Sequence, residues 1–437
     1  MIEVNNEEQL RAAIAHAHGS TGTDEGTADT EIALGQSILL NGPLILPAGV
    51  TLTASGRQPR ILGFSHGDGI GLTANNTVKN IAIQTAADAR AIFIQPTTAT
   101  DLGTLTLKNL RVTGMVQLTT RTPAQTVQIV ADRVDVVFAD TRNYTETQLK
   151  YGVTVEQGAF TVHNFSASED SLITATLTDI SVGRLEAPVL GSGIFIAGFG
   201  DKGGKVEVST LTTGEVHSHG MIPGGQPNLI TGGIFILSGA HATEIVSKEV
   251  VYTYGVNDMT LDVWGEVDSW ITEKAVRSFG TSGIGFVNFG TVHHFEAKEP
   301  IETFGSGARA FNQYDGTIDE ATFAGLITHG DGSIGMQVSR PVGSISITGD
   351  IETHGGIGDS LVKGVIMELE AMALSIQADG HIQKLTVGGN LITHGDGVTT
   401  VRVDGGTADT TTIGGEIQAL GEGATTLLEE NGGSLNL

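Results

Sequence analysis

The chain contains no cysteine among its 437 residues. This excludes disulfide bonds, a thiolate metal site and a cysteine nucleophile. Aromatic residues are also scarce, at 5% with only two tryptophans, and 23 Lys and Arg stand against 49 Asp and Glu. The formal charge of −26 repels nucleic acid and anionic membrane surfaces, so we expect neither as a partner. The same negative charge disfavours polyuronate substrates but is compatible with a neutral glycan as the substrate.

Long apolar runs are missing as well. No stretch of about 18 apolar residues occurs, which excludes a transmembrane helix of ordinary length. The opening, MIEVNNEEQLRAAIAHA, has no basic segment followed by an apolar one, as a secretory signal would have. We therefore expect a soluble chain that is either cytoplasmic or a secreted mature form, and the sequence leaves the compartment open.

Glycine is abundant, at 61 residues, and part of it marks a repeat. The segments VVYTYG, AVRSFG, PIETFG, GLITHG and DIETHG end at Gly255, Gly280, Gly305, Gly330 and Gly355, each 25 residues after the last. Internal repeats of this length indicate a solenoid. Longer gaps occur at three places, near 141–152, between 220 and 234, and after 355. We interpret these as coils that carry loop insertions.

Within the repeat, apolar residues alternate with a period of two, as in Ile234 and Ile236, which indicates strands rather than helices. Two columns follow the period. Hydroxyl residues, which we expect inside and hydrogen-bonded from coil to coil, are Thr253, Ser278, Thr303, Thr328, Thr353 and Thr393. Rings, which we expect to stack, are Tyr254, Phe279, Phe304, His329, His354 and His394. The glycine after each ring suits a turn with positive φ.

A leucine-rich repeat or a propeller would need a different signature or period. The sequence therefore predicts an all-β, right-handed parallel β-helix solenoid of roughly 13 to 16 coils of about 25 residues. At its N-terminus, Asn5 and Glu8 resemble a capping box, and an apolar stripe follows at Leu10, Ala13, Ile14 and Ala17. We expect residues 1–20 to form an amphipathic capping helix and residues 21–437 to form a single β-helix domain.

The capping helix and the strands that follow it, including LPAGVTL at 46–52, resemble the pectin-lyase-like superfamily. The resemblance covers nearly the whole chain at the level of architecture. It implies a right-handed parallel β-helix, and its members include lyases, glycoside hydrolases and non-enzymatic scaffolds, some of them trimers. The sharper motifs are absent: the chain has SHG at 218–220 but no RIK, and Arg340 in SRPVG is isolated.

Glycan-active members of such a fold bind substrate on the outer face of one strand stack. The repeat predicts one outward column at Thr260, Gly285, Ala310 and Gly335, whose small residues would leave room for a flat ligand. A second outward column contains the polar residues Asp262, Asn312 and Gln337.

Polar and aromatic residues converge beside these columns. Aromatic planes stack on sugars, and paired carboxylates perform glycoside hydrolysis. The predicted catalytic residues are Asp262, Glu266 and Asp315, and the predicted substrate-binding residues are Trp264, Asn288, Asn312, Tyr314, Gln337 and Arg340. Asp262 and Asp315 come from coils two apart, about 9.6 Å, which suits an inverting arrangement. We expect no metal site and no cofactor, because histidines such as His329, His354 and His394 occupy a ring position that also accepts Tyr and Phe.

Two hypotheses remain from the sequence. The first is a carbohydrate-active enzyme, a glycoside hydrolase or a lyase, acting on a neutral or weakly charged glycan. The alternative is a non-enzymatic scaffold of an adhesin-like or glycan-binding kind, which the low aromatic content of 5% favours. By analogy with the superfamily, a homo-oligomer such as a trimer is an expected assembly for either.

Overall fold

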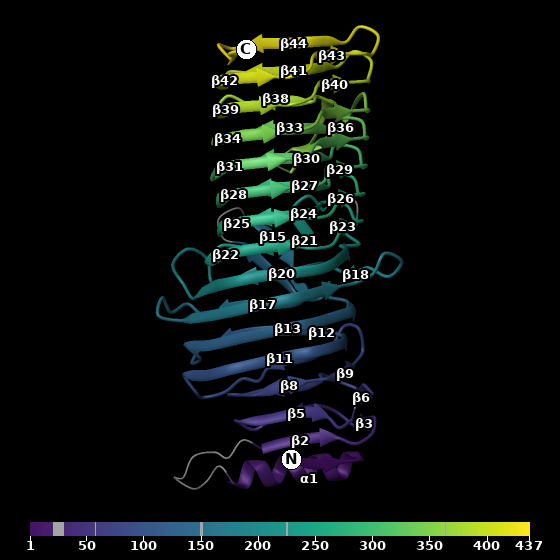
Figure 1. Cartoon of the computed structure of the whole chain (residues 1–437), viewed down its shortest axis with the longest axis vertical. Coiled ribbons are helices and arrows are strands. Elements are labelled where there is room, and N and C mark those ends of the chain that lie inside the picture. The colour runs from purple at the N-terminus through teal and green to yellow at the C-terminus, as the bar shows by residue number, and fades with distance from the viewer. Residues whose placement is uncertain (21–29, 57, 149–151, 224–225, 363) are drawn as a thin grey trace.

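A computed structural model of the chain describes residues 1–20, 30–56, 58–148, 152–223, 226–362 and 364–437. The protein is all-β apart from one helix, and its strands lie across the long axis, one above the next, from the N-terminal to the C-terminal end (Figure 1). Within the described residues they form a sheet of 27 strands, a sheet of 16 and a two-stranded hairpin. This architecture is consistent with a β-helix solenoid.

Sheet B, the sheet of 16 strands, forms one face, and its stacked strands pair in parallel. In the first half of the chain they are β4 (Leu44–Ile45), β7 (Ile70–Leu72), β10 (Arg90–Ile94), β12 (Met115–Arg121), β16 (Gly158–Phe165), β19 (Ser192–Ala197) and β21 (Leu229–Ile236). In the second half they are β24 (Asp258–Val263), β27 (Ile284–Asn288), β30 (Arg309–Gln313), β33 (Ile334–Val338), β38 (Leu374–Ile376), β41 (Thr399–Asp404) and β44 (Thr425–Glu430).

Sheet A, the sheet of 27 strands, forms the second and third faces. Four long strands run across both: β11 (Asp101–Thr113), β13 (Thr126–Phe138), β17 (Leu172–Val182) and β20 (Lys205–His219). On the second face lie β1 (Ile2–Val4), β2 (Thr30–Leu34), β5 (Val50–Ala54), β8 (Thr77–Lys79), β22 (Ala240–Ser247), β25 (Glu266–Thr272), β28 (Thr291–Ala297), β31 (Thr317–Phe323), β34 (Pro341–Ile347), β39 (His381–Val387), β42 (Thr407–Ile413) and β45 (Ser434–Leu435).

The third face holds short strands of two to five residues. They are β3 (Ile38–Leu40), β6 (Arg60–Phe64), β9 (Ile81–Gln84), β18 (Val189–Leu190), β23 (Val251–Thr253), β26 (Val276–Ser278), β29 (Ile301–Thr303), β32 (Leu326–Thr328), β35 (Ile351–Thr353), β40 (Leu391–Thr393) and β43 (Ile417–Ala419). Paired residues there follow the repeat read from the sequence, since Val251 pairs with Val276, then Ile301, Leu326 and Ile351.

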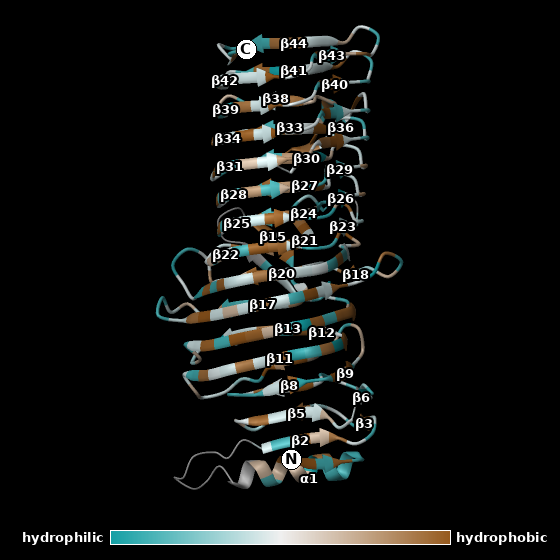
Figure 2. Ribbon diagram, viewed as in Figure 1, coloured by the Kyte–Doolittle hydropathy of each residue, from teal (hydrophilic) through white to brown (hydrophobic). Residues whose placement is uncertain are grey.

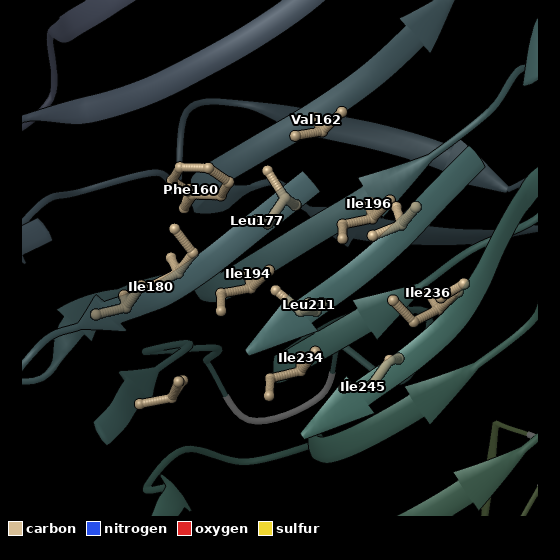
Figure 3. Close-up of a cluster of buried hydrophobic side chains, with 14 of the residues drawn as sticks. Phe160, Val162, Leu177, Ile180, Ile194, Ile196, Leu211, Ile234, Ile236 and Ile245 are labelled. Atoms are coloured by element: carbon tan, nitrogen blue, oxygen red, sulfur yellow. The ribbon is translucent and has the colours of Figure 1, made fainter. Parts of the chain in front are cut away.

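The core is one continuous apolar cluster inside the stack. Phe160, Ile194 and Ile234 of sheet B stack upon one another and face Leu177 and Leu211 of sheet A, as Figure 3 shows. Along longer strands such as β17, hydrophobic and hydrophilic residues alternate (Figure 2). This period of two is what a strand with one buried side requires.

The glycine that ends each repeat segment does not have the positive φ that we expected. A Cβ on Gly280 would lie 1.8 Å from the carbonyl oxygen of Gly255, and one on Gly305 would lie 1.9 Å from that of Gly280. Glycine is therefore required because successive backbones stack in contact. The positive φ falls two residues later, at Asn257 and Ser282 with φ of 57° and at Gly307 with φ of 66°.

The two columns of the repeat lie where the sequence indicated. The hydroxyl column is fully buried, but its bonds stay within a coil: Thr253 Oγ1 lies 2.8 Å from Thr260 Oγ1, and Thr393 Oγ1 lies 2.7 Å from Thr400 Oγ1. The expected bonding from coil to coil is therefore wrong at these positions. The rings do stack, with centroids 4.6–5.2 Å apart and planes within 6–12° from Tyr254 to His394.

The helix α1 (Glu7–Ser20) lies at the N-terminal end of the stack (Figure 1). Asn5 N–H donates to Gln9 Oε1 at 2.8 Å, and Gln9 N–H donates to Asn6 Oδ1 at 2.9 Å. The cap therefore uses Asn6 and Gln9 in place of Asn5 and Glu8. The helix buries Leu10, Ala13 and Ala17, which supports the predicted apolar stripe. No helix in the described part of the chain is both long and apolar enough to cross a bilayer.

Candidate functional site

A groove of about 740 Å³ lies on the outer side of sheet B, across β24, β27, β30 and β33. Aromatic rings, amides and charged side chains meet in it. A cavity of about 710 Å³ beside α1 is lined mainly by apolar residues. An open depression of about 1,030 Å³ follows the third face, where Arg184 is ion-paired to Asp135 and Glu215.

The three insertions predicted from the sequence border this groove. The first forms the hairpin of β14 (Thr145–Gln148) and β15 (Val153–Glu156), and β15 joins β21 through Thr154 and Val155. The second contributes Asn228 and Ile230, and the third forms the hairpin of β36 (Ile357–Val362) and β37 (Val365–Glu370). Residues 149–151, 224–225 and 363 of these insertions lie outside the described part.

The second and third insertions come close to each other at the groove. Ser360 Oγ of β36 donates to the Gly307 carbonyl at 3.2 Å, which ties the third insertion to the coil of β30. A Cβ at Gly364 would lie 3.6 Å from Asn228 Oδ1 of the second insertion. The sequence could not show on which face of the solenoid the insertions lie. In the structure, residues of all three line the same groove.

A row of aromatic rings runs along the groove, one from each successive coil. The centroids of Trp264 and Phe289 are 4.9 Å apart, and those of Phe289 and Tyr314 are 4.7 Å apart, with planes tilted by about 40°. Trp264 is only 6% exposed because it packs with Phe235 under the first insertion. The partly exposed rings of Phe289 and Tyr314 are therefore the surfaces open to a ligand.

Asp262 forms part of the groove floor and is fully buried. Its neighbours in the column are Phe235 and Val287, which supply no polar group to solvate a carboxylate. Burial raises the pKa of Asp262 well above its usual range, and the nearby Trp264 side chain offsets this in part. The carboxyl therefore holds its proton more tightly than an exposed aspartate does.

Arg309 is a second buried polar group of the groove, 4% exposed. Its Nε donates to Gln337 Oε1 at 2.9 Å and its Nη1 to the Gly307 carbonyl at 3.1 Å, so both of these acceptors are neutral. Burial lowers the pKa of Arg309 to about 10, which leaves the guanidinium charged at neutral pH. The groove thus contains a charged guanidinium from β30 and, from β24, a buried carboxyl whose pKa is raised.

Two linked ion pairs lie along the groove. Arg340 Nε lies 3.3 Å from Asp315 Oδ1, and Arg340 Nη1 lies 2.7 Å from Asp379 Oδ2. Asp379 follows β38, so the pairs tie together residues from three coils. Asn312 and Gln337 belong to the same outward column as Asp262, on the coils nearer to these ion pairs.

Seven of the nine residues predicted from the sequence line this one groove: Asp262, Trp264, Asn312, Tyr314, Asp315, Gln337 and Arg340. Glu266 does not. It begins β25 on the second face and lies beside His293, because the chain turns a corner between Trp264 and Glu266.

Asn288 also does not line the groove. It is fully buried, and its Nδ2 donates to Gln313 Oε1 and the Thr317 carbonyl, both at 3.1 Å. Its role is to hold the turn that leaves β27.

The predicted column of small residues was assigned to the wrong side. A Cβ on Gly285 would lie 2.2 Å from Ile301 Cγ2, and one on Gly335 would lie 2.6 Å from Ile351 Cγ2. Both positions therefore face the core, where they make room for the third face. Ile284, which precedes Gly285, and Arg309, which precedes Ala310 of the same column, face the groove, and the sequence interpretation missed both.

Two buried carboxyls lie at the base of the first insertion. Burial and the nearby Asp258 raise the pKa of Glu156 to about 8. Burial also raises the pKa of Asp258 to about 6, although it accepts hydrogen bonds from Thr231 and from the Gly255 N–H. Both carboxyls therefore hold a proton more tightly in the folded state than in the unfolded chain.

We expect Glu156→Gln to change the pH dependence of stability. Because the folded pKa of Glu156 is raised, its contribution is fully present below about pH 4.5 and is lost as the pH rises through about 8. The variant should melt close to the parent at pH 5 and above it at pH 9. Thermal melts at both values measure this, with the exposed Glu169→Gln as the control. A constant difference between variant and parent would contradict the assignment.

Compared with known protein families, curated proteins and solved structures, the chain matches none of them.

Proposed function

We propose that the groove on sheet B binds a neutral or weakly charged glycan. The observation that carries the proposal is the row of Phe289 and Tyr314 in a groove that also holds the amides of Asn312 and Gln337. Sugars present an apolar ring face and a rim of hydroxyls, and these groups match rings and amides respectively. Arg309 adds one fixed positive charge, which favours a ligand with at most a few anionic groups.

The proposal includes the architecture that presents the groove. We infer a right-handed parallel β-helix of the pectin-lyase-like kind, with roughly 13 to 16 coils and α1 as its cap. Its support is the parallel pairing at intervals of 25 residues, as from Val276 to Ile301 and Leu326. In such a solenoid, insertions at equivalent turns shape a binding face, as the three insertions do here.

Hydrolysis of a glycosidic bond is the reaction that the carboxyls of the groove favour. Burial raises the pKa of Asp262 and so favours its protonated form, which suits a general acid, while Asp315 is ion-paired to Arg340. They come from coils two apart, about 9.6 Å between backbones, which suits the inverting arrangement. Because Asp262 is fully buried, a substrate must reach it past Trp264.

The second candidate is a non-enzymatic scaffold. The observation that favours it is the regular exterior of the third face, where one stack of rings runs from Tyr254 to His394. A uniform ladder of this kind supports a role in which the coils serve only as a rigid rod.

Titration calorimetry with a panel of neutral and singly charged oligosaccharides tests the proposal. We expect at least one to bind the parent, and Tyr314→Ala to weaken that binding by about tenfold, or about 1.4 kcal/mol. The matched control is Tyr252→Ala, since Tyr252 lies on the third face beside Arg277. Equal loss in both variants would overturn the site, and a panel without any binder would favour the scaffold.

A further inference from the structure

Histidines and carboxylates from five successive coils meet on the outer side of the second face. His241 of β22 and His293 of β28 flank the coil of β25, which carries Glu266 and Asp268. Glu207 of β20 lies beyond His241, and Asp319 of β31 lies beyond His293. The order is therefore symmetrical, with two carboxylates in the middle, a histidine on each side and a carboxylate outside each histidine.

In each histidine, Nδ1 contacts the carboxylate at the outer end of this row. His241 Nδ1 lies 2.8 Å from Glu207 Oε2, and His293 Nδ1 lies 2.6 Å from Asp319 Oδ2. Metal-binding histidines in proteins have the same arrangement, because a carboxylate that accepts the other N–H fixes the ring and its tautomer.

The second nitrogen of each ring points toward the middle carboxylates. His241 Nε2 lies 3.0 Å from Asp268 Oδ1, and His293 Nε2 lies 3.4 Å from Glu266 Oε1. Ligand atoms of His241, Glu266 and Asp268 all lie within 4.8 Å of one another. Donor atoms around a tetrahedral zinc ion are about 3.3 Å apart, given bond lengths of about 2.0–2.1 Å, so small side-chain shifts would complete the geometry.

We propose that His241, Glu266, Asp268 and His293 form a binding site for a divalent transition-metal ion of the Zn²⁺ class. Two imidazoles and two carboxylates suit Zn²⁺ better than Ca²⁺ or Mg²⁺, which prefer oxygen ligands alone. The ion would clamp β22, β25 and β28 on the second face, away from the groove on sheet B. This also gives a role to Glu266, which the sequence interpretation assigned to catalysis.

Another group of possible ligands is less suited. Glu352 lies 2.7 Å from His394 Nε2 and 3.5 Å from His354 Nε2, and it offers one carboxylate to two rings. Those two rings belong to the stacked column, with centroids 4.6 Å apart, in a position that elsewhere takes Tyr or Phe. Stacking therefore explains their residue type, whereas the ring nitrogens of His241 and His293 all contact carboxylates.

The experiment uses the full chain after removal of metals with a chelator. Calorimetry with ZnCl₂ at pH 7.5 should show one strong site, and Co²⁺ should give the visible absorption of tetrahedral coordination. The double variant that combines His241→Gln and His293→Gln should weaken Zn²⁺ binding at least tenfold. The single variant Asp268→Asn should weaken it as well. Because all of these side chains are partly exposed, the variants should keep the parent's far-ultraviolet circular dichroism.

Two matched controls make the result specific. His381→Gln removes a histidine of the same face that lies 3.2 Å from Asp409 but has no second histidine beside it, and it should bind Zn²⁺ as the parent does. His354→Gln with His394→Gln should also leave the strong site unchanged. Zn²⁺ binding that is equal in the parent and the His241–His293 double variant would overturn the proposal, and so would its loss in either control.

Discussion

Gly305→Ala is expected to destabilise the protein by about 3 kcal/mol or more. The new Cβ would lie 1.9 Å from the Gly280 carbonyl oxygen and 2.6 Å from the Thr281 nitrogen. Both are backbone atoms of the preceding coil, so no rotation of a side chain relieves the contact. The coils would have to separate, at the cost of the pairing between β26 and β29.

Urea unfolding measures the effect, with Gly356→Ala as the control. Gly356 stands one residue after a glycine of the same column, and a Cβ there would meet only Asp331 Oδ1 at 3.6 Å. The control should change the midpoint little. If Gly305→Ala unfolds at the same urea concentration as the control, the close stacking of successive backbones is wrong.

Asp262→Asn is expected to raise stability and to lower activity together. The folded pKa of Asp262 is raised well above its usual value of 3.8, so its contribution to stability is fully present below that value. It is lost as the pH rises toward the folded pKa. Asparagine does not ionise, and the variant should therefore be more stable than the parent at pH 8 and similar to it at pH 3.

Turnover is the second readout of Asp262→Asn. Where an oligosaccharide is hydrolysed, loss of the general acid should reduce kcat by about 10² to 10⁴, while calorimetry should find binding nearly unchanged. A residue whose replacement stabilises the fold and removes activity has the usual signature of a functional site. Unchanged kcat would remove Asp262 from the mechanism and leave the groove as a binding site only.

Much of the site follows from the sequence because the repeat converts sequence distance into spatial contact. Phe289 and Tyr314 are 25 residues apart in the chain, and their ring centroids are 4.7 Å apart in space. The same period placed Asn312 beside Gln337 in one outward column. A regular stack fixes which residues are neighbours, and no three-dimensional information is needed for that step.

The errors occurred where the chain departs from a regular strand. Between Ile284 and Phe286 the alternation is interrupted, and the sequence interpretation therefore put Gly285 outside and overlooked Arg309, which pairs with Ile284. The corner after Trp264 directs Glu266 to another face. Residue type alone does not fix the position of a corner, because glycine marks both a left-handed turn and a close contact.

The insertions were visible in the sequence, but their side was not. Asn228 and Gly364 are far apart in the chain, and only the structure brings them to the same groove. The lengths of the gaps indicated which coils carry loops. The direction in which a loop folds depends on its contacts, such as that of Ser360 with Gly307, which have no counterpart in the repeat.

Hydrogen exchange of the protein with and without its tightest-binding oligosaccharide tests the central claim most directly. We predict slower exchange in β24, β27, β30 and β33 and in the hairpin of β36 and β37, which together form the groove. Exchange in β26, β29 and β32 of the third face should not change. Protection of the third face, with none along sheet B, would contradict the assignment of the groove as the glycan site.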